Sequence, residues 1–423
     1  MRILYLATAV ALAAIPATAA AQSVAANASP QLFVFASDQD YLSEDFFIVF
    51  DLTAGRSDRV VTTLPVGARG TMPHHLEYET PPRGALLFAN SHHTEDTYLL
   101  DLADPRAPKI VNRLKPPAPY RFTHDFKRLA NGNVLVGFLR SEGPSPELDD
   151  PTLPGGHGGI AEYTGDGRLL RTASAAADGL PHPVRPYAFA VLPEADRIVT
   201  TSAPMMEKSS ADVVQIWRYS DFKLLHTLRL PPGRKDGGED WPEAAAAPFA
   251  PRVMADGSVL LSAYGCGFYR ITDVASDRPQ VANVYSVQVP KAGEGEMGAC
   301  SVPVLVGTQW LLPVGRENAV LTLDVSDPQK PRETSRLTFP DDFAPHWLAK
   351  DPRSNRLILG AEAGGEQGMY VLLIDPETGR LSLDPTIGAA ERPGYLDLAR
   401  EEWPHGATGP AWAHAALFLP LVE

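Results

Sequence analysis

Cysteine, clustered positive charge and long hydrophobic runs are all scarce in this chain of 423 residues. Two cysteines cannot build a disulfide scaffold and permit at most one bond. Lys and Arg number 37 against 51 Asp and Glu, so the net charge is -14. Because phosphate backbones are bound by clustered Lys and Arg, we expect no nucleic-acid partner. The acidity instead favours solubility.

No apolar run after the N-terminus approaches the roughly 20 residues that cross a bilayer. The N-terminus itself reads Met1-Arg2, then an apolar run over 3–15, then three alanines ending at Ala21. This order is typical of a secretory signal. We therefore expect a signal peptide over 1–21, cleavage near Ala21, and one periplasmic or secreted domain over 22–423 with no membrane span.

Long helical periodicity is also nearly absent, whereas 34 glycines and 40 prolines are spread along the chain. Such spacing indicates many turns. Between them lie short apolar runs, for example 32–35, 134–138 and 356–359. Apolar runs of this length bounded by turn residues predict strands.

One short unit recurs along the chain, a strand that ends in a turn rich in Asp, Pro and Gly. The two most similar copies are LDLADPRAP at 100–108 and LDVSDPQKP at 323–331. The seven copies are centred on Asp51, Asp101, Tyr163, Tyr219, Asp273, Asp324 and Asp375. A period of about 50 residues with four short strands per unit indicates a β-propeller. The sequence therefore predicts an all-β fold, a seven-bladed β-propeller; an array of unrelated β-sandwiches would not give one regular period.

The two ends of the chain fit a closed ring. Only three strands are expected between Gln31 and the second unit, so blade one lacks its inner strand. The segment 411–420 (AWAHAALFLP) can supply that strand. We expect it to join blade one and close the ring, which leaves no free edge at the join.

Four of the eleven histidines share one local frame, each at the opening of a short predicted strand. They are His74, His124, His346 and His414. The inner strand of each blade lines the axis of a propeller, so these residues are expected on blades two, three, seven and one, which are consecutive around the ring. Four imidazoles around one axis predict a metal site. Imidazole ligation suits copper, iron, nickel or zinc, and affinity favours copper.

Further residues are expected around this site. His75 follows His74 directly and faces away in a regular strand, but it can bind where the strand is irregular. Five others are expected to orient or shield the ligands or to line a small apolar channel: Asp125, Glu77, Trp347, Trp412 and Tyr187.

His405 lies in the loop that crosses to blade one. We expect it over the mouth of the propeller, either as a general acid or base or as a surface histidine. The pair His92-His93 is expected in a solvated loop on the outward side of blade two. Cys266 and Cys300 are expected on one face of neighbouring blades, where an oxidising compartment permits a disulfide. A redox pair or an extra soft ligand is the alternative.

Several of these segments resemble one known family. They are 72–77 with its double histidine, THDFKRLANG at 123–132, LDLADPRAPK at 100–109, the strand start at 158–160, and the ending GPAWAH at 409–414. Together they are similar to the selenium-binding protein and methanethiol oxidase family. The resemblance implies a seven-bladed propeller and, in bacterial members, a periplasmic copper enzyme that oxidises methanethiol with oxygen. It also implies copper ligation by His74, His75, His124 and His414.

The sequence leaves three functions open. The first is a copper-dependent oxidase of a small thiol, with dioxygen as a second substrate and with iron or zinc as alternative metals. The second is a propeller that binds a partner or stores metal without chemistry, since one fold hosts many functions. The third is another metal propeller, either an iron oxygenase with four histidines or a calcium lactonase. Calcium prefers oxygen ligands, so the imidazoles disfavour the lactonase.

Overall fold

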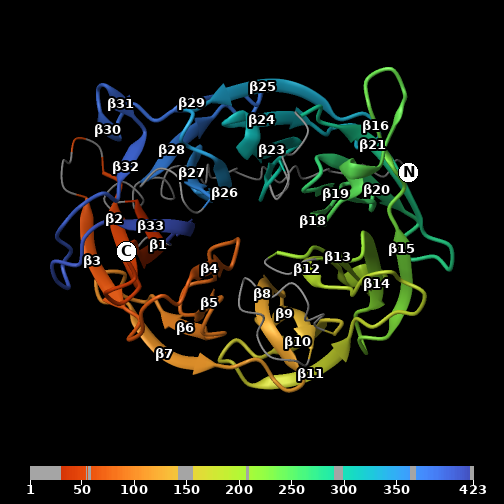
Figure 1. The fold of residues 1–423 in the computed structure, drawn as a ribbon, viewed down its shortest axis with the longest axis horizontal. Helices are drawn as coiled ribbons and strands as arrows, with labels where there is room; N and C mark the ends of the chain where they lie inside the picture. Colours follow the sequence, from red (N-terminus) through yellow and green to blue (C-terminus); the bar gives the residue numbers. More distant parts are fainter. Residues whose placement is uncertain are drawn as a thin grey trace, which may run out of the picture.

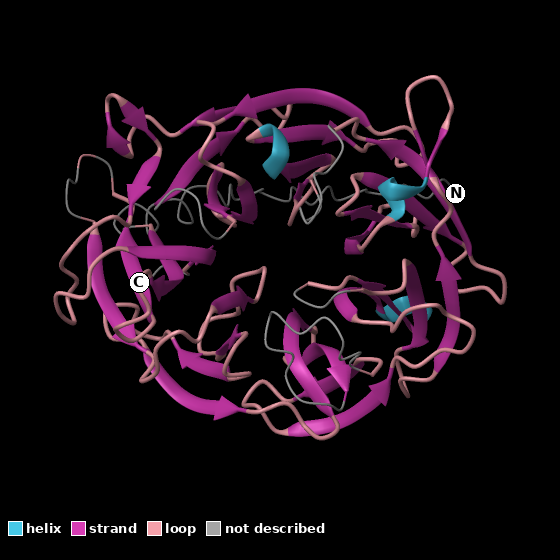
Figure 2. Cartoon of the chain, in the orientation of Figure 1, coloured by secondary structure: helices cyan, strands magenta, loops and turns pink. Residues whose placement is uncertain are grey.

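The computed structural model describes residues 30–53, 55, 59–141, 156–205, 209–289, 299–362 and 368–419. The predicted signal peptide lies outside these residues. Their strands form seven antiparallel sheets arranged as blades around one axis (Figures 1 and 2). The predicted fold class, an all-β seven-bladed propeller, is therefore confirmed.

From the axis outward, the strands of each blade are as follows. Blade one contains β33 (Ala411–Phe418), β1 (Gln31–Asp38), β2 (Phe46–Asp51) and β3 (Val60–Pro65). Blade two contains β4 (Pro73–Leu76), β5 (Leu87–Ser91), β6 (Thr97–Asp101) and β7 (Lys109–Leu114). Blade three contains β8 (Tyr120–Arg128), β9 (Val134–Ser141), β10 (Gly159–Tyr163) and β11 (Leu169–Ser174). Blade four contains β12 (Pro186–Leu192), β13 (Arg197–Ser202), β14 (Val213–Arg218) and β15 (Leu224–Arg229).

Blade five contains β18 (Pro248–Val253), β19 (Val259–Ala263), β20 (Gly267–Thr272) and β21 (Gln280–Ser286). Blade six contains β22 (Val304–Val306), β23 (Gln309–Val314), β24 (Ala319–Asp324) and β25 (Arg332–Thr338). Blade seven contains β26 (Pro345–Lys350), β27 (Arg356–Ala361), β28 (Gly368–Ile374) and β29 (Leu381–Leu383), and β32 (Tyr395–Asp397) also pairs with β28. Two small hairpins are β16 (Gly233–Arg234) with β17 (Asp240–Trp241), and β30 (Gly388–Ala389) with β31 (Arg392–Pro393). Three 3-10 helices complete the described elements: η1 (Pro193–Ala195), η2 (Pro242–Ala245) and η3 (Gly315–Glu317).

The ring closes as the sequence predicts. The C-terminal strand β33 pairs antiparallel with β1, from Leu32 opposite Phe418 to Asp38 opposite Ala411. The first strand of the chain is thereby hydrogen-bonded to the last one (Figure 1). Blade one thus combines three N-terminal strands with one C-terminal strand.

The recurring sequence unit marks the end of the third strand of each blade. In several copies the Asp at that point turns the chain with its own side chain. The carboxylate of Asp101 accepts a hydrogen bond from the backbone N–H of Ala103 (2.9 Å), and that of Asp324 accepts one from Ser326 (3.0 Å). An Asp that bonds the backbone two residues ahead favours a turn over continuation of the strand. This explains why Asp recurs at the blade period.

The core lies between neighbouring blades. Most inner strands are buried on both faces, although β22 is half-buried, and β24 and β27 are nearly continuous apolar runs. The outermost strand has one solvent-exposed face, so exposed and half-buried side chains alternate along β25. A buried cluster that includes Phe35, Phe47 and Leu87 joins blades one and two. Each blade is therefore stabilised by burial of apolar surface against its two neighbours.

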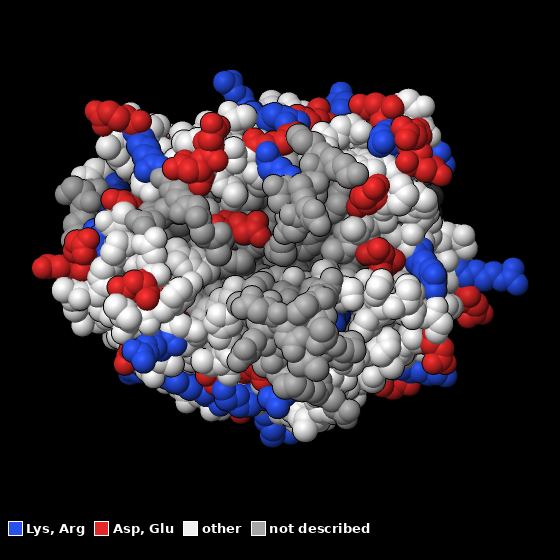
Figure 3. Space-filling model, viewed as in Figure 1, with Lys and Arg blue, Asp and Glu red and all other residues white. Residues whose placement is uncertain are grey.

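The surface carries charges of both signs. On the face in Figure 3, acidic and basic side chains of the described residues are interspersed around the rim. Within the described ranges, no helix is both long and apolar enough to cross a membrane.

Candidate metal centre

Each histidine of the repeated frame lies in an irregularity of an inner strand. In β4 the pairing with β5 shifts between Pro73 and Leu76, so two residues, His74 and His75, face one residue of the partner strand. The same shift occurs at 124–125 in β8 and at His346 in β26. A further shift lies at His414 in β33. A bulge re-aims side chains and commonly borders active sites.

The bulges bring the imidazoles of four consecutive blades together. The ring of His74 lies 4.1 Å from that of His75 and 4.5 Å from that of His414, measured between centroids. The His75 ring is 4.3 Å from the His124 ring. His346 joins through its Nε2 atom, which lies 3.2 Å from Nε2 of His414. We call these five residues the histidine cluster. Each is at most 5% exposed.

His75 belongs to the cluster because its strand is irregular. In a regular strand it would point away from His74. The bulge instead stacks the two rings with an interplanar angle of 13°. One nitrogen atom from each of His74, His75 and His414 can be chosen so that all three lie within 4.8 Å of one another.

Hydrogen bonds fix which nitrogen of two imidazoles faces the cluster. Nδ1 of His124 lies 3.0 Å from the carbonyl oxygen of Tyr187 and therefore donates to it. Its Nε2 atom is then unprotonated, and it is buried with no hydrogen-bond partner in the part of the chain that the structure describes. Nδ1 of His346 lies 2.6 Å from the Ser301 hydroxyl. Partners of this kind on the far nitrogen are typical of metal-binding histidines.

Burial keeps the cluster neutral, which is the form that binds metal. Desolvation lowers the pKa of His124 to about 3, although its hydrogen bond to Tyr187 acts in the opposite direction. Desolvation also lowers the pKa of His74 and His414 well below the ordinary value, with smaller contributions from the neighbouring histidines. The pKa of His346 is lowered by the same cause.

The donor set fits a transition metal. Two nitrogens bound to one ion at 2.0–2.1 Å with a tetrahedral angle lie about 3.3 Å apart, close to the 3.2 Å between His346 and His414. Both ring nitrogens of His74 and the Nε2 atoms of His75 and His124 are buried and have no hydrogen-bond partner among the described residues. Buried polar atoms normally have partners, and an ion among them would supply one. His74, His75 and His414 could therefore hold a metal together, with His124 and His346 beside them.

Of the three aromatic residues predicted around the site, the structure places Trp347 and Tyr187 beside the histidine cluster. Trp347 is fully buried, donates its indole N–H to the carbonyl of Ala416 (2.8 Å), and lies 5.1 Å from the His75 ring. Tyr187 packs on His124 with 3.8 Å between ring centroids. Its hydroxyl lies 2.6 Å from that of Tyr264. Trp412 is only half-buried, and Ser37 of β1 is its partner in the strand pairing.

The two predicted carboxylates, Glu77 and Asp125, line a cavity together with Tyr78. Glu77 is engaged by Arg128 through two hydrogen bonds of 2.8 and 2.5 Å, so it does not contact the histidines as a partner. Asp125 follows His124 and is 2% exposed, and its Oδ1 atom has no hydrogen-bond partner within the described ranges. Burial raises the pKa of Asp125 to about 7.

His405 lies elsewhere than over the mouth. Its Nδ1 atom lies 2.8 Å from the hydroxyl of Thr63, which belongs to β3, the outermost strand of blade one. Its ring packs on Phe46, as does that of Trp403. Because Trp403 anchors the crossing loop over the outer strands, His405 is held away from the axis. The expectation that His405 lies over the mouth of the propeller is therefore corrected.

His92 is a buried residue that the sequence reasoning placed in a solvated loop. It is 5% exposed, packs on Phe122 (4.5 Å) and lies 5.7 Å from the His74 ring. The missed signal is topological: β5 runs antiparallel to β4, so the end of β5 lies beside the start of β4, and Pro73 pairs with Ser91. His93, the next residue, is exposed as expected.

Cys266 and Cys300 form a disulfide in the structure, with 5.2 Å between their Cα atoms. Cys266 precedes β20 of blade five, and Cys300 pairs with Val314 of blade six. The bond therefore ties these two blades together and leaves neither sulfur as a soft ligand.

Comparisons with known proteins support the fold. No family model and no curated sequence match the chain. Among solved structures, a hypothetical selenium-binding protein from Sulfolobus tokodaii is similar at TM-score 0.69 and 14% identity, over 93% of this chain and 94% of that one. A periplasmic gluconolactonase from Pseudomonas aeruginosa is similar at TM-score 0.60 and 13% identity, over 93% and 99%. A protein from Lactobacillus plantarum is similar at TM-score 0.61 and 13% identity, over 93% and 100%. At such low identity these likenesses establish a shared propeller fold and no shared activity.

Proposed function

We propose that the chain is an exported oxidoreductase that holds copper in the histidine cluster and oxidises a small thiol, such as methanethiol, with dioxygen. The observation that supports the proposal is the convergence of five buried, neutral imidazoles from four blades. Imidazole sets of this kind are typical of copper, iron and zinc sites, and copper has the highest affinity of the three. Copper would supply redox chemistry between two oxidation states.

The residues around the cluster would bind a small apolar substrate and exclude water. Tyr187, Phe249 and Tyr264 form a buried aromatic group on the arc opposite His414. Trp347 covers the side of His75. Apolar walls with few polar groups are typical of small-molecule sites. A short alkyl thiol suits such walls because it buries no unpaired polar group besides the sulfur.

Two features support action outside the cytoplasm. The sequence predicts a secretory signal, and the structure contains a disulfide. Disulfides persist in oxidising compartments and are rare in the cytosol.

Metal analysis tests the proposal. The full chain, expressed with its own leader and recovered from the periplasm, should contain near one copper per chain and consume methanethiol together with dioxygen. His414→Ala should lower the copper content and the activity while the ring remains folded. His226→Ala is the matched control, since His226 lies on the outer strand β15. The proposal would be contradicted by folded protein that binds no copper when copper is supplied and that does not consume the thiol.

One observation favours a second candidate, a protein that holds metal without turnover. No member of the histidine cluster is more than 5% exposed, and deep burial suits storage or structural binding. The same experiment separates the candidates, because a storage protein would contain copper yet leave thiol and dioxygen unchanged. Iron in place of copper would favour an oxygenase.

A further inference from the structure

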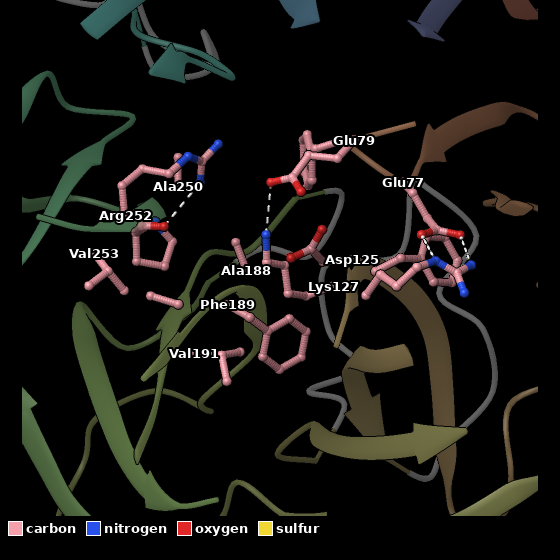
Figure 4. A pocket seen from close by; sticks show the side chains of 15 residues that line it. Glu77, Glu79, Asp125, Lys127, Ala188, Phe189, Val191, Ala250, Arg252 and Val253 are labelled. Carbon is pink, nitrogen blue, oxygen red and sulfur yellow. Dashed lines mark hydrogen bonds and ion pairs between the residues drawn. The ribbon is translucent and has the colours of Figure 1, made fainter. Parts of the chain in front are cut away.

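A cavity of about 210 Å³ lies beside the histidine cluster, along the inner strands of blades two to five (Figure 4). Its walls come from 77–79 after β4 and from parts of β8, β12 and β18. A cavity of about 150 Å³ holds benzene, so this one accommodates roughly eight non-hydrogen atoms. Tyr78 and Asp125 separate it from the cluster: Tyr78 has its hydroxyl 3.4 Å from Nδ1 of His75, and Asp125 follows His124.

The lining carries three acidic and three basic side chains, so its formal charge is balanced. Four of them form pairs within the wall. Glu77 is held by Arg128 deep in the wall, and Glu79 is held by Lys127 at 2.9 Å nearer the solvent (Figure 4). These pairs satisfy one another and leave Asp125 and Arg252 as the remaining charges.

Asp125 and Arg252 have hydrogen-bonding capacity that the other described residues do not use. Asp125 is 2% exposed, lines the cavity, and its Oδ1 atom has no partner among the described residues. Arg252 donates to two backbone carbonyls, those of Pro251 (3.0 Å) and Pro303 (3.2 Å). Over the ranges that the structure describes, no carboxylate lies within ion-pair distance of it. Because a guanidinium has five N–H donors, several remain for a ligand.

The rest of the wall is apolar. It includes Ala188, Phe189, Val191 and Ala250 (Figure 4). A ligand here therefore meets one cation, one buried carboxylate oxygen and an apolar surface. An overall neutral ligand with charges of both signs leaves the balance of the lining unchanged, whereas burying a single net charge is unfavourable.

We propose that this cavity binds a small zwitterion, an α-amino acid with a short apolar side chain. Its carboxylate would be bound by Arg252, its ammonium by Asp125, and its side chain by the apolar wall. An unpaired buried carboxylate oxygen is costly, and an ammonium donor satisfies it. The proposal does not depend on metal in the histidine cluster and goes beyond the proposed oxidase activity.

Binding of three matched probes to the full mature chain tests the proposal. The probes are L-valine, which carries both charges, isobutyrate, which lacks the ammonium, and isobutylamine, which lacks the carboxylate. Affinity is measured by calorimetry with and without EDTA, so that chelation of metal by valine is separated from binding to the protein. L-Valine should bind roughly 10- to 100-fold more tightly than either single-charge probe, as expected for one charge-assisted hydrogen-bonding group.

Variants locate the binding. Arg252→Gln should weaken L-valine and isobutyrate by roughly 10- to 100-fold and leave isobutylamine unchanged. Asp125→Asn should weaken L-valine and isobutylamine instead. Arg229→Gln is the matched control, since Arg229 also donates to a backbone carbonyl, that of Gly179, but lies on the outer strand β15. Circular dichroism confirms that each variant is folded, and Arg252→Lys, which keeps the cation, should bind L-valine with intermediate affinity.

Three results would overturn the proposal. The first is the absence of L-valine binding at millimolar concentration. The second is an equal affinity of Arg252→Gln and wild-type protein for L-valine. The third is loss of valine binding in His414→Ala with EDTA present, because that would place the ligand in the histidine cluster. None of these results depends on copper content or thiol oxidation, so the two proposals fail separately.

Discussion

At the scale of single residues, neighbouring positions in β8 differ sharply in the cost of removing a charge. Arg128 holds Glu77, a carboxylate that is 2% exposed and whose pKa is raised by burial despite the guanidinium. Lys127 holds Glu79, whose side chain is 80% exposed. Removing one partner of a buried pair leaves an uncompensated charge, whereas an exposed pair is screened by water.

Arg128→Gln should therefore lower the free energy of unfolding by about 3–5 kcal/mol. Lys127→Gln, the control at the adjacent position, should lower it by at most about 1 kcal/mol. Urea denaturation of the two variants at pH 7 provides the comparison. Equal effects would show that Glu77 is not buried as the structure has it.

His92 gives the ring a sensitivity to acid. Desolvation, with smaller contributions from His124, His93 and Arg140, lowers its pKa to about 3 from an ordinary 6.5. Between about pH 6.5 and pH 3, His92 is therefore protonated in the unfolded chain and neutral in the folded chain. Stability contributed by neutral His92 is present above pH 6.5 and is lost as the pH falls toward 3.

Lowering the pH from 7 to 5 should therefore reduce the free energy of unfolding by about 2 kcal/mol through His92 alone. In metal-free protein, His92→Asn should reduce by about 2 kcal/mol the amount by which the free energy of unfolding at pH 7 exceeds that at pH 5. His182→Asn, at an exposed position, should leave the difference unchanged. An unaltered difference in His92→Asn would mean that His92 is protonated in the folded ring.

The same residues show how far the sequence predicts the site. The shared frame of His74, His124, His346 and His414 was readable because equivalent strands of a ring meet at its axis. Inclusion of His75 depends on a bulge, and no local pattern in Pro73–Leu76 announces one. His92 was misplaced because the antiparallel pairing of β5 with β4 brings the end of β5 beside the site. His405 was misplaced because its loop packs on Phe46 beside Trp403.

At the scale of elements, bulges occur in inner strands both with and without histidine, so they belong to the fold rather than to the histidine cluster. Blades four and five carry the same shift, between Pro186 and Phe189 and between Phe249 and Arg252, although neither has a histidine there. The bulge therefore recurs independently of the side chain that occupies it. In the described residues, histidine fills the position on one arc, and Tyr187 or Ala250 fills it on the other.

The disulfide between Cys266 and Cys300 adds a covalent link between blades five and six. It closes a segment of 34 positions, and both sulfurs are fully buried. In the chain-entropy view a loop of this length contributes about 3–4 kcal/mol by restricting the unfolded chain. The double variant Cys266→Ala and Cys300→Ala should lose about that much stability in urea denaturation. Reductant should not destabilise the double variant further, and detection of two free thiols in native wild-type protein would contradict the bond.

At the scale of the whole molecule, the sequence predicts the ring well because the unit that ends the third strand of each blade recurs seven times along the chain. Asp turns such as those at Asp101 and Asp324 mark several blades, and the chain ends supply complementary strands. The additions to the ring were not predicted. The strand β32 and the hairpin of β30 with β31 lie after the last repeat, where no neighbouring copy provides a period for comparison.

Closure of the ring couples folding to the histidine cluster, because β33 carries both the closing hydrogen bonds and His414. Leu417 and Phe418 in this strand are at most 1% exposed, and burying two such side chains contributes about 3–6 kcal/mol. A chain that ends at Pro410 should therefore lose much of its stability and expose the edge of β1, which promotes aggregation.

A synthetic peptide of residues 411–419 should restore the truncated ring by pairing with β1, as judged by thermal unfolding and by light scattering. The same peptide with His414→Ala keeps every apolar contact of Leu417 and Phe418, so it should restore the fold equally well. It should not restore metal binding, because it lacks the imidazole that faces His74 and His346. Restoration of metal binding by the alanine peptide would show that the ring needs the strand but the metal does not need His414. Failure of both peptides to rescue folding would instead show that β33 must be covalently linked to close blade one.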